Sequence, residues 1–435
     1  MVLFGVITLM FVKLPPMVAK QDSVLNTYSA LVEVDALARQ RFVENITDDS
    51  LVQGAIRGMM RHLDPYSGYI SPEELPGFLR RNRGQFCGVG LEAGLRDGIM
   101  TVIAPIEGSA ASRAGLLAGD QLLFIDGRDV EHLSTFEVED LLVGSPGTSV
   151  TLAYRRAGRH DAVEVRLTRE QVSLHSVRGT RRLRDGSWDY WIDAGAGIGY
   201  LRVSNFLETT GTEFDAALAG LRQQGLAGLI LDLRFNPGGF LHQAVAIADR
   251  FLSNGLIIST VNRRSAIDEF RAQPDPSDLD VPLFILMNSG SASSSEIVAG
   301  ALQARGRARV VGERSFGKGS VQHLIQLVGQ KAAIKLTVAH YRLPDGRIIH
   351  RTENRQGRAE GSDWGIKPDV EVVLTPEERG RIQESRRLLD MPRESQSSAG
   401  DAGVETPDLE IEMDRQLQAA IDLARADRLS QYLGH

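Results

Sequence analysis

The chain contains an apolar run that leads into a serine-rich turn, Leu283-Phe284-Ile285-Leu286-Met287-Asn288-Ser289-Gly290-Ser291-Ala292-Ser293-Ser294-Ser295-Glu296. The apolar run predicts a buried strand, and the residues from Glu296 to Leu302 predict a helix. The serines therefore occupy a strand-to-helix turn. At a helix N-terminus, free amides and the positive end of the helix dipole stabilise the negative charge of an attacking alkoxide or a tetrahedral intermediate. The stretch predicts a serine nucleophile.

A lysine follows about two dozen residues later, in Gly312-Glu313-Arg314-Ser315-Phe316-Gly317-Lys318-Gly319-Ser320-Val321-Gln322. A serine hydroxyl attacks well only when a base removes its proton, and lysine is that base in Ser-Lys pairs. Lysine can serve only if its pKa is depressed, which burial achieves because desolvation penalises the ammonium form. Gly317 and Gly319 would let the chain close tightly around Lys318. The alternative is a Ser/Gly-rich turn followed by an exposed lysine.

Length and composition narrow the function classes. At 435 residues the chain should hold two or three domains. Its net charge of -7 argues against nucleic acid as a main partner, because phosphate binding needs a positive field. Cys87 is the only cysteine, so an intramolecular disulfide and a cysteine-rich zinc site are excluded. We expect no metal and no organic cofactor.

The first residues form an apolar segment. Residues 1–12 are almost wholly apolar and have the length of a signal-peptide core, which is too short to span a bilayer. Lys13, Pro15 and Pro16 end the segment, and no basic region precedes it. We expect a shortened export signal or membrane anchor in residues 1–20. A buried N-terminal strand is the alternative.

The rest of the chain divides by pattern into a helical region, a strand-rich region, an alternating region and a tail. Residues 21–83 have helical spacing, whereas residues 84–172 contain short strands and glycine turns. Strands and helices then alternate, which indicates an α/β core within residues 173–390. Residues 391–435 hold a polar linker followed by a predicted surface helix from Glu410 to Leu429.

Several motifs together resemble one family, the C-terminal processing peptidases, which are PDZ-containing Ser-Lys endopeptidases. Beside the serine and lysine segments, the motifs are His62-Leu63-Asp64-Pro65-Tyr66-Ser67, Leu231-Asp232-Leu233-Arg234-Phe235-Asn236-Pro237-Gly238-Gly239 and Trp364-Gly365-Ile366-Lys367-Pro368-Asp369-Val370. The resemblance implies a multidomain α/β protein with a helical N-terminal region, a PDZ domain, a serine peptidase core and a C-terminal helix. Phe235 departs from the family pattern, which usually has a second asparagine there.

The resemblance also implies roles for particular residues. Ser293 is the nucleophile, Lys318 the base and Gln322 the residue that orients the base. Ser291, Ser294 and Ser295 are then turn and capping residues. The amide of the residue after the nucleophile, Ser294, is expected to be one oxyanion donor. The resemblance assigns the other to the amide of Gly239.

A second site is expected in the PDZ-like region. Gly88-Val89-Gly90-Leu91 matches the loop whose free amides bind a peptide's terminal carboxylate while the peptide adds as a strand. A predicted helix from Thr135 to Val143 places Val138, Leu141 and Leu142 on one face, either to line an apolar pocket or to pack in the core. The expected partners are proteins with apolar C-terminal tails, and the family resemblance favours a periplasmic location. The sequence does not indicate an oligomeric state.

Three other readings compete with a Ser-Lys peptidase. A phosphate-binding loop fails because Gly319 stands where Ser or Thr must hold magnesium, and because strands rather than a helix follow. A non-catalytic PDZ adaptor would not need Ser293, Lys318 and Gln322 together. Histidine-based catalysis lacks its motifs, since neither H-E-x-x-H nor G-x-S-x-G is present.

Overall fold

The structure is a computed structural model that divides into two compact units. It describes residues 7–8, 21–46, 48–83, 85–96, 98–106, 108–156, 159, 161–183, 185–264, 267–275, 279–327, 331–353, 359–360, 363–390 and 413–433. Among these, Gly77–Ser320 and the residues from His340 onward form one unit, and Ile7–Pro76 with Val321–Ala339 form the other. The expected linker after residue 390 lies outside the described residues, as does the expected N-terminal signal except for Ile7 and Thr8.

The smaller unit combines the helical N-terminal region with a strand hairpin from later in the chain. Its elements are β1 (Ile7–Thr8), α1 (Gln21–Arg41), α2 (Asp48–Leu63), β2 (Gly68–Ile70), the start of α3 (Glu74–Arg83), and most of β21 (Ser320–Gln326) and β22 (Ala333–Arg342). Strand β2 pairs antiparallel with β22, and β1 pairs parallel with β21. Within the described ranges, no helix has both the length and the apolarity needed to cross a bilayer.

The first part of the larger unit is a small strand-rich domain, the PDZ-like domain. Its strands and helices are β3 (Gln85–Gly88), β4 (Leu91–Arg96), β5 (Ile99–Pro105), α4 (Ala110–Arg113), β6 (Gln121–Ile125), β7 (Arg128–Asp129), α5 (Thr135–Leu142), β8 (Ser149–Arg155), β9 (Ala162–Thr168) and β10 (Glu170–Ser173). The main sheet has the order β4-β5-β6-β8-β9, with β7 beside β6. Alternate residues of β8 are buried, as expected for a strand with one face on a core. Val138 of α5 is fully buried in that core.

The second part of the larger unit is built around a mostly parallel seven-stranded sheet. Its strands are β11 (Val177–Arg178), β14 (Trp191–Asp193), β15 (Ile198–Val203), β16 (Gly228–Asp232), β19 (Leu283–Met287), β20 (Arg309–Gly312) and β25 (Val370–Glu371). Strands β15, β16, β19, β20 and β25 run parallel. The central strands are continuous apolar runs because both faces of the sheet are covered.

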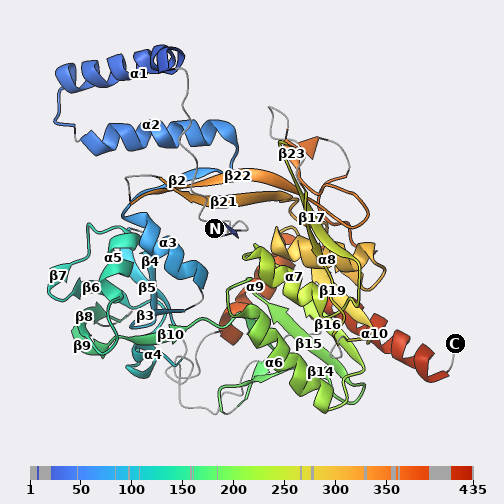
Figure 1. Ribbon diagram of the computed structural model, residues 1–435. Coiled ribbons are helices and arrows are strands. Elements are labelled where there is room, and N and C mark those ends of the chain that lie inside the picture. The colour runs from blue at the N-terminus through green and yellow to red at the C-terminus, as the bar shows by residue number, and fades with distance from the viewer. Residues whose placement is uncertain are drawn as a thin grey trace. The chain divides into compact units, whose positions relative to one another are not determined.

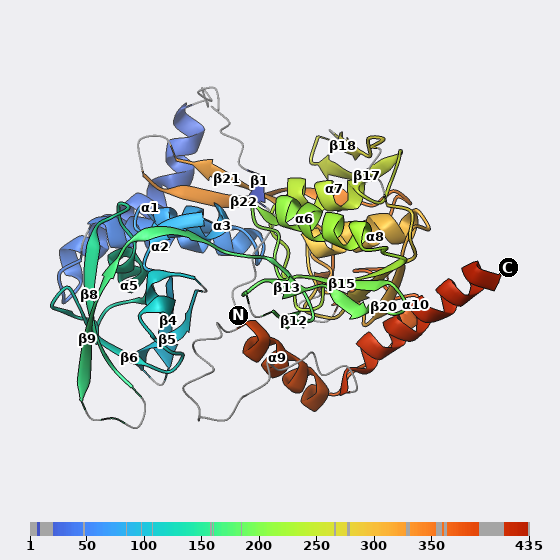
Figure 2. The same cartoon turned by 90° about the horizontal axis from the view of Figure 1, so that it is seen from below.

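Helices cover both faces of this sheet. The helices are α6 (Thr210–Gln223), α7 (Leu241–Asp249), α8 (Ser294–Ala304), α9 (Pro376–Asp390) and α10 (Arg415–Leu433). Helices α6, α7 and α8 lie on one face, and α10 lies along the other (Figures 1 and 2).

The remaining strands lie outside this sheet. They are β12 (Arg181–Arg182), β13 (Trp188–Asp189), β17 (Leu256–Asn262), β18 (Ile267–Arg271), β23 (Thr352–Glu353) and β24 (Ala359–Glu360). In open parallel sheets, sites form at the carboxyl ends of the strands.

The C-terminal helix differs from the expected surface helix in its burial. Leu417, Ala420, Ile421 and Ala424 of α10 pack into the cluster that covers the sheet, and all four are buried. Their spacing is that of one helix face. Two of the four are alanines, which give a weak apolar signal in the sequence, so the prediction missed this buried face.

Candidate active site

The predicted nucleophile lies at the carboxyl end of β19, in the nucleophile turn (residues 288–293). Ser293 is fully buried and directly precedes α8. Its backbone has φ 59° and ψ -115°, a conformation that residues other than glycine rarely adopt. A strained nucleophile on a strand-to-helix turn is also the arrangement of the nucleophile elbow in other hydrolases.

A second turn, the glycine turn (residues 233–239), follows β16 and packs against the nucleophile turn. A Cβ atom on Gly238 would lie 2.7 Å from the Cβ atom of Ser293, so only glycine fits there. The neighbouring serines bond to the glycine turn as well. The hydroxyl of Ser291 donates to the carbonyl of Leu233 at 2.8 Å, and that of Ser295 donates to the carbonyl of Asn236 at 3.0 Å. Both side chains hold the two turns together.

Glu296 joins the nucleophile segment to the lysine segment, and the sequence analysis gave it no role. One carboxylate oxygen, Oε2, accepts the backbone amides of Ser293 and Lys318, each at 2.8 Å. The other oxygen, Oε1, accepts the amide of Gly317 at 2.7 Å and the hydroxyl of Ser315 at 2.5 Å. Burial raises the pKa of Glu296, although these hydrogen bonds oppose the shift. The signal was the Ser-x-x-Glu spacing of a capping box.

Lys318 is fully buried just ahead of β21. Close packing surrounds it, as expected from its flanking glycines. A Cβ atom on Gly319 would lie 2.5 Å from the backbone nitrogen of His350, and one on Gly317, whose φ is +87°, would lie 2.8 Å from the Cβ atom of Arg351. Gln322 is also buried, on β21, where its side-chain amide donates to the hydroxyl of Thr337 at 3.2 Å. The orienting role of Gln322 stays a prediction.

The backbone amides around Ser293 leave two donors for an oxyanion. Among the described residues of the two turns, the amides of Ser293, Ser295 and Gly238 all have acceptors. The amides of Gly239 and Ser294 donate to no acceptor within the described part of the chain. The hydroxyl of Ser294 donates to the carbonyl of Gly239 at 3.1 Å, which holds the two residues together. These are the two amides that the sequence analysis assigned to the oxyanion hole.

The glycine turn is anchored at its base by a buried charge cluster. Arg234 bonds Asp232 at 2.7 Å and also Asp414, from the start of the C-terminal segment, at 2.7 Å. Arg386 of α9 bonds Asp232 at 2.5 Å, and Tyr200 donates to the same carboxylate at 2.8 Å. Burial alone would raise the pKa of Asp232, but the charges of Arg234 and Arg386 and its hydrogen bonds hold that pKa well below its usual value. The sequence analysis did not identify this cluster.

The predicted carboxylate-binding loop lies between β3 and β4 of the PDZ-like domain. Gly90 has φ +71°, and a Cβ atom there would lie 2.1 Å from the Cβ atom of Ser109, so the loop requires glycine. The amide of Val89 donates to the carbonyl of Leu142 at 3.3 Å. The amide of Gly90 donates to no acceptor among the described residues. The loop therefore offers fewer free amides than expected, with Gly90 as a free donor.

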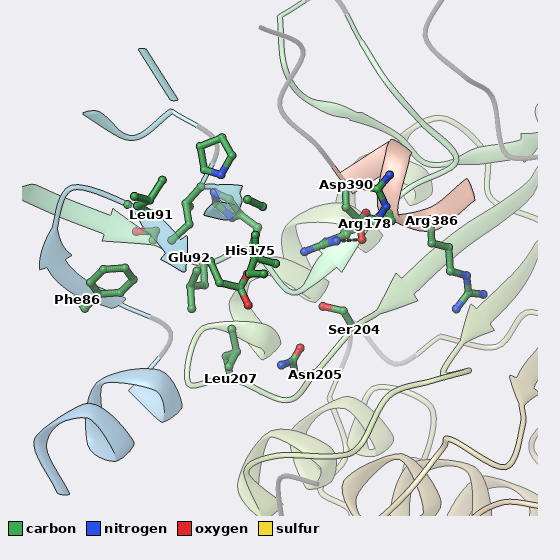
Figure 3. Close-up of a pocket in the computed structure, with 18 of the residues that line it drawn as sticks. Phe86, Leu91, Glu92, His175, Arg178, Ser204, Asn205, Leu207, Arg386 and Asp390 are labelled. Atoms are coloured by element: carbon green, nitrogen blue, oxygen red, sulfur yellow. Dashed lines mark ion pairs between the residues drawn. The ribbon is translucent and has the colours of Figure 1, made fainter. Parts of the chain in front are cut away.

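A cavity of about 750 Å³ includes this loop. Val89, Gly90, Leu91 and Leu142 contribute to its lining, and so do residues of the sheet part such as Arg178 and Arg386 (Figure 3). Leu142 lines this cavity and is also part of the domain core, in which Val138 of the same helix is buried and against which Leu141 packs. Within the described residues, no group of three or more His, Cys, Asp or Glu side chains is placed to hold a metal ion.

Comparisons with known proteins identify the family. Residues 197–372 match the model of peptidase family S41, residues 101–156 that of the PDZ domain, and residues 15–74 that of the activating protease CtpB N-terminal domain. The chain is 36% identical to the carboxy-terminal-processing protease of Bartonella bacilliformis, over 80% of this chain and 76% of that protein.

Two further similarities are of the same kind. The chain is 32% identical to the carboxy-terminal processing protease CtpA of Bacillus subtilis, over 77% of this chain and 66% of that protein. Among solved structures, the chain is similar to a photosystem II D1 C-terminal processing protease. The two sequences are 28% identical, the match covers 82% of this chain and 87% of that chain, and the TM-score is 0.46. The family models and curated relatives confirm the resemblance and the predicted fold class. The chain belongs to the carboxy-terminal processing proteases of peptidase family S41, which makes it a serine-type peptidase with a PDZ domain.

Proposed function

We propose that this peptidase binds the C-terminal tail of a protein through its PDZ domain and cleaves that protein with Ser293 and Lys318. One observation carries the catalytic assignment. The amides of Ser293 and Lys318 bond the same oxygen of Glu296, so the nucleophile and the lysine are fixed to one buried atom. This contact joins two segments that lie about two dozen residues apart in the sequence.

The proposed chemistry is acyl transfer in two steps. The hydroxyl oxygen of Ser293 attacks the scissile carbonyl carbon while Lys318 takes the hydroxyl proton. The amides of Gly239 and Ser294 stabilise the oxyanion. Lys318 then gives the proton to the leaving amine, and an acyl-enzyme remains. A water molecule, deprotonated by Lys318, releases the acyl group and regenerates Ser293. In this scheme Gln322 orients Lys318.

Tail binding is proposed to use the loop Gly88-Val89-Gly90-Leu91. The free amide of Gly90 can bind a terminal carboxylate, and the apolar side chains of Leu91 and Leu142 line the same cavity, which suits an apolar tail. A neutral amide does not gain the same charge-assisted hydrogen bonds as a carboxylate. Proteins with apolar C-terminal tails are therefore the proposed substrates.

The decisive experiment measures hydrolysis of an unstructured protein with an apolar C-terminus. We expect Ser293→Ala to lower kcat at least about a thousandfold while the protein stays folded, because members of a catalytic unit fail together. Ser291→Ala is the matched control and should keep substantial activity. An inactive Ser291→Ala beside an active Ser293→Ala would contradict the nucleophile assignment. Binding without hydrolysis by the unmodified protein would instead support a PDZ adaptor.

A separate experiment tests the loop with one peptide that has a free or an amidated C-terminus. Loss of one charge-assisted contact, worth about 1.5–3 kcal/mol, should lower capture of the amidated peptide roughly ten- to a hundredfold. The measurement is kcat/KM for both peptides with the intact enzyme. Equal values would refute recognition of the carboxylate and leave the catalytic assignment untouched.

Lys318 can be tested through protonation. A lysine base must be neutral, so kcat/KM should rise with pH until Lys318 has lost its proton. Lys318→Arg should be inactive at every pH, because a guanidinium does not deprotonate in proteins. An active arginine variant would show that another group is the base.

We also infer an extracytoplasmic location, based on the apolar residues 1–12 and the family's usual location. Fractionation of cells that express the full-length protein tests this. Recovery in the cytoplasmic fraction alone would contradict it.

A further inference from the structure

The peptidase side of the cavity has a wall of arginines, defined here as Arg178 of β11, Arg202 of β15 and Arg386 of α9. All three line the cavity together with Asp390, the last residue of α9. Asp390 forms ion pairs with both Arg178 and Arg202. Figure 3 shows Arg178 beside Asp390 on one side of the cavity, with Arg386 on the same side. The arginine wall therefore brings several cationic groups from three elements to one surface.

Arginines outnumber carboxylates in the lining of this cavity, which has seven arginines and three carboxylates. Several of the arginines have partners behind the lining. Arg234 pairs with Asp232 and Asp414, Arg386 with Asp232, and Arg387 with Glu384. Asp390, in contrast, is shared, so that one negative charge faces the two positive charges of Arg178 and Arg202. An incoming carboxylate could therefore compete with Asp390 for Arg178 and Arg202, which already bind a carboxylate.

Arg178 is the more accessible of the two arginines that share Asp390. Its side chain is 23% exposed, whereas that of Arg202 is 5% exposed. Burial lowers the pKa of Arg202 well below its usual value, and the charges of Arg178 and Arg386 lower it further. A carboxylate that binds Arg178 would also offset this repulsion between neighbouring guanidinium groups, because charge-assisted hydrogen bonds are stronger in a desolvated site.

The cavity that contains the arginine wall also contains the proposed tail-binding loop. Gly90 and Leu91 of that loop line the same space as Arg178 and Arg202. A tail bound at the loop therefore occupies a space that contains the wall. Because the loop amides bind the terminal carboxylate in the proposed function, the wall is left for another carboxylate of the same tail.

We propose that the arginine wall binds the carboxylate of an acidic side chain, so that an aspartate or glutamate upstream of the apolar terminal residue is a specificity determinant. This inference rests on the proposed function, because it assumes a protein tail in the cavity. The terminal carboxylate has the same chemistry as an acidic side chain. The experiment must therefore vary the two carboxylates separately.

The experiment uses four versions of one peptide, with Glu or Gln upstream of the terminal residue and with a free or an amidated end. We expect the intact enzyme to show a kcat/KM about tenfold higher for Glu than for Gln at low ionic strength, and a smaller ratio at high salt. Arg178→Gln should reduce the Glu/Gln ratio to near one. Asp390→Asn should increase the ratio, because it removes the internal competitor. If Arg178 and Asp390 had only a structural role, their two variants would not change the Glu/Gln ratio in opposite directions.

The matched control is Arg181→Gln, three residues from Arg178 along the chain. Arg181 is about half exposed and pairs with Asp189. This variant changes the net charge by the same amount, and we expect it to leave the Glu/Gln ratio unchanged. A Glu/Gln ratio near one in the intact enzyme, or a ratio that survives Arg178→Gln, would overturn the proposal. So would an effect of Arg178→Gln on the free/amidated ratio alone, since the wall would then bind the terminal carboxylate.

A measurement of peptide binding shows whether the arginine wall or the proposed function has failed. The four peptides carry a fluorophore, and their anisotropy gives Kd for Ser293→Ala, which cannot turn them over in the proposed mechanism. If no peptide is hydrolysed by the intact enzyme, the proposed function fails. A tighter Kd for Glu than for Gln, lost in the double variant with Arg178→Gln, would still support the wall. Equal Kd values would refute it.

Discussion

The two turns of the candidate active site each contain a residue other than glycine with a positive φ, but they differ in their anchors. Phe235 in the glycine turn has φ 62°, and Ser293 in the nucleophile turn has φ 59°. Besides its bonds to the glycine turn, the nucleophile turn is held by neighbours within its own segment. Asn288 and Ser291 bond across the turn, and Glu296 accepts the amide of Ser293 three residues away. The glycine turn depends on Arg386 and Asp414, which lie more than 150 residues further along the chain. The nucleophile turn therefore has anchors close to it in the sequence, whereas the glycine turn also has anchors from distant parts of the chain.

The largest expected effect comes from the local anchor, Glu296. Its four hydrogen-bond donors fill both carboxylate oxygens, which fits the ionised form. In Glu296→Gln one carboxylate oxygen becomes an amide nitrogen, which cannot accept hydrogen bonds. Either the amides of Ser293 and Lys318, or the hydroxyl of Ser315 and the amide of Gly317, then lose their acceptor. We expect kcat to fall roughly ten- to a hundredfold, since a misplaced catalytic group costs that much. Steady-state kinetics on a tail peptide measure the fall.

Glu296→Asp is a useful companion variant. It keeps the charge but shortens the side chain, so it should be impaired as well. Full activity in Glu296→Gln would show that the shared carboxylate does not position Ser293 and Lys318. The local anchor would then be structural only.

The same contrast explains what the sequence could predict. The strand Leu283–Met287 was predicted with its observed bounds, because a short apolar run before a polar turn is a local signal. Ser293 and Ser294 lie beside that strand, so their position follows from it. The partnership of Arg234 with Asp414 has no local signal, and α10 shows only a weak apolar face with two alanines. No local sequence pattern pairs Arg234 with Asp414, because these residues meet only after the domain has folded.

The next expected effect comes from the remote anchor. Asp414 is buried and bonds Arg234 at 2.7 Å. In Asp414→Asn, Arg234 loses part of its compensating charge in a desolvated site, which should lower the free energy of unfolding by about 2–4 kcal/mol. Asp427→Asn, in the helix α10 that follows Asp414, is the control, because its pair with Arg309 has both side chains more than one-third exposed and should cost less than about 1 kcal/mol. Chemical denaturation compares the two. Equal losses would show that the remote anchor contributes no more than a surface pair.

The two turns should also respond to acid in opposite directions. The pKa of Asp232, beneath the glycine turn, is lowered, whereas burial raises the pKa of Glu296 beside the nucleophile turn. The stability from Asp232 is present above its unfolded pKa of about 4 and is lost as pH falls through the lower folded value. The contribution of Glu296 has the opposite sign, because its raised folded pKa favours the native state at low pH and loses that advantage as pH rises.

Variants make this contrast measurable between pH 3.5 and about 6. The destabilisation caused by Asp232→Asn should shrink as pH falls, and that caused by Glu296→Gln should grow. Urea unfolding at several pH values measures the direction in which each difference changes. Parallel slopes for the two variants would refute opposite shifts.

The smallest expected effect concerns the strained residue of the glycine turn. A phenylalanine with positive φ is costly, whereas asparagine adopts that conformation more readily. Phe235→Asn gives up a contact in which the Arg386 guanidinium lies 5.2 Å from the ring centre, worth about 0.5–1 kcal/mol, but it relieves strain of about 1–3 kcal/mol. We expect a net gain of about 0.5–1 kcal/mol in the free energy of unfolding. Phe235→Leu loses the ring without relieving the strain, so it should be destabilised.

The positive φ of Ser293 in the nucleophile turn cannot be relieved in the same way without removing the proposed catalytic group. Ser293→Gly should also gain stability, because glycine adopts positive φ freely, but it should be inactive. Chemical denaturation of Phe235→Asn, Phe235→Leu and Ser293→Gly therefore asks whether the two positive-φ residues carry similar strain. If Phe235→Asn were less stable than the unmodified protein, the ring contact would outweigh the backbone strain. The glycine turn would then be held by Phe235 as well as by its remote charges.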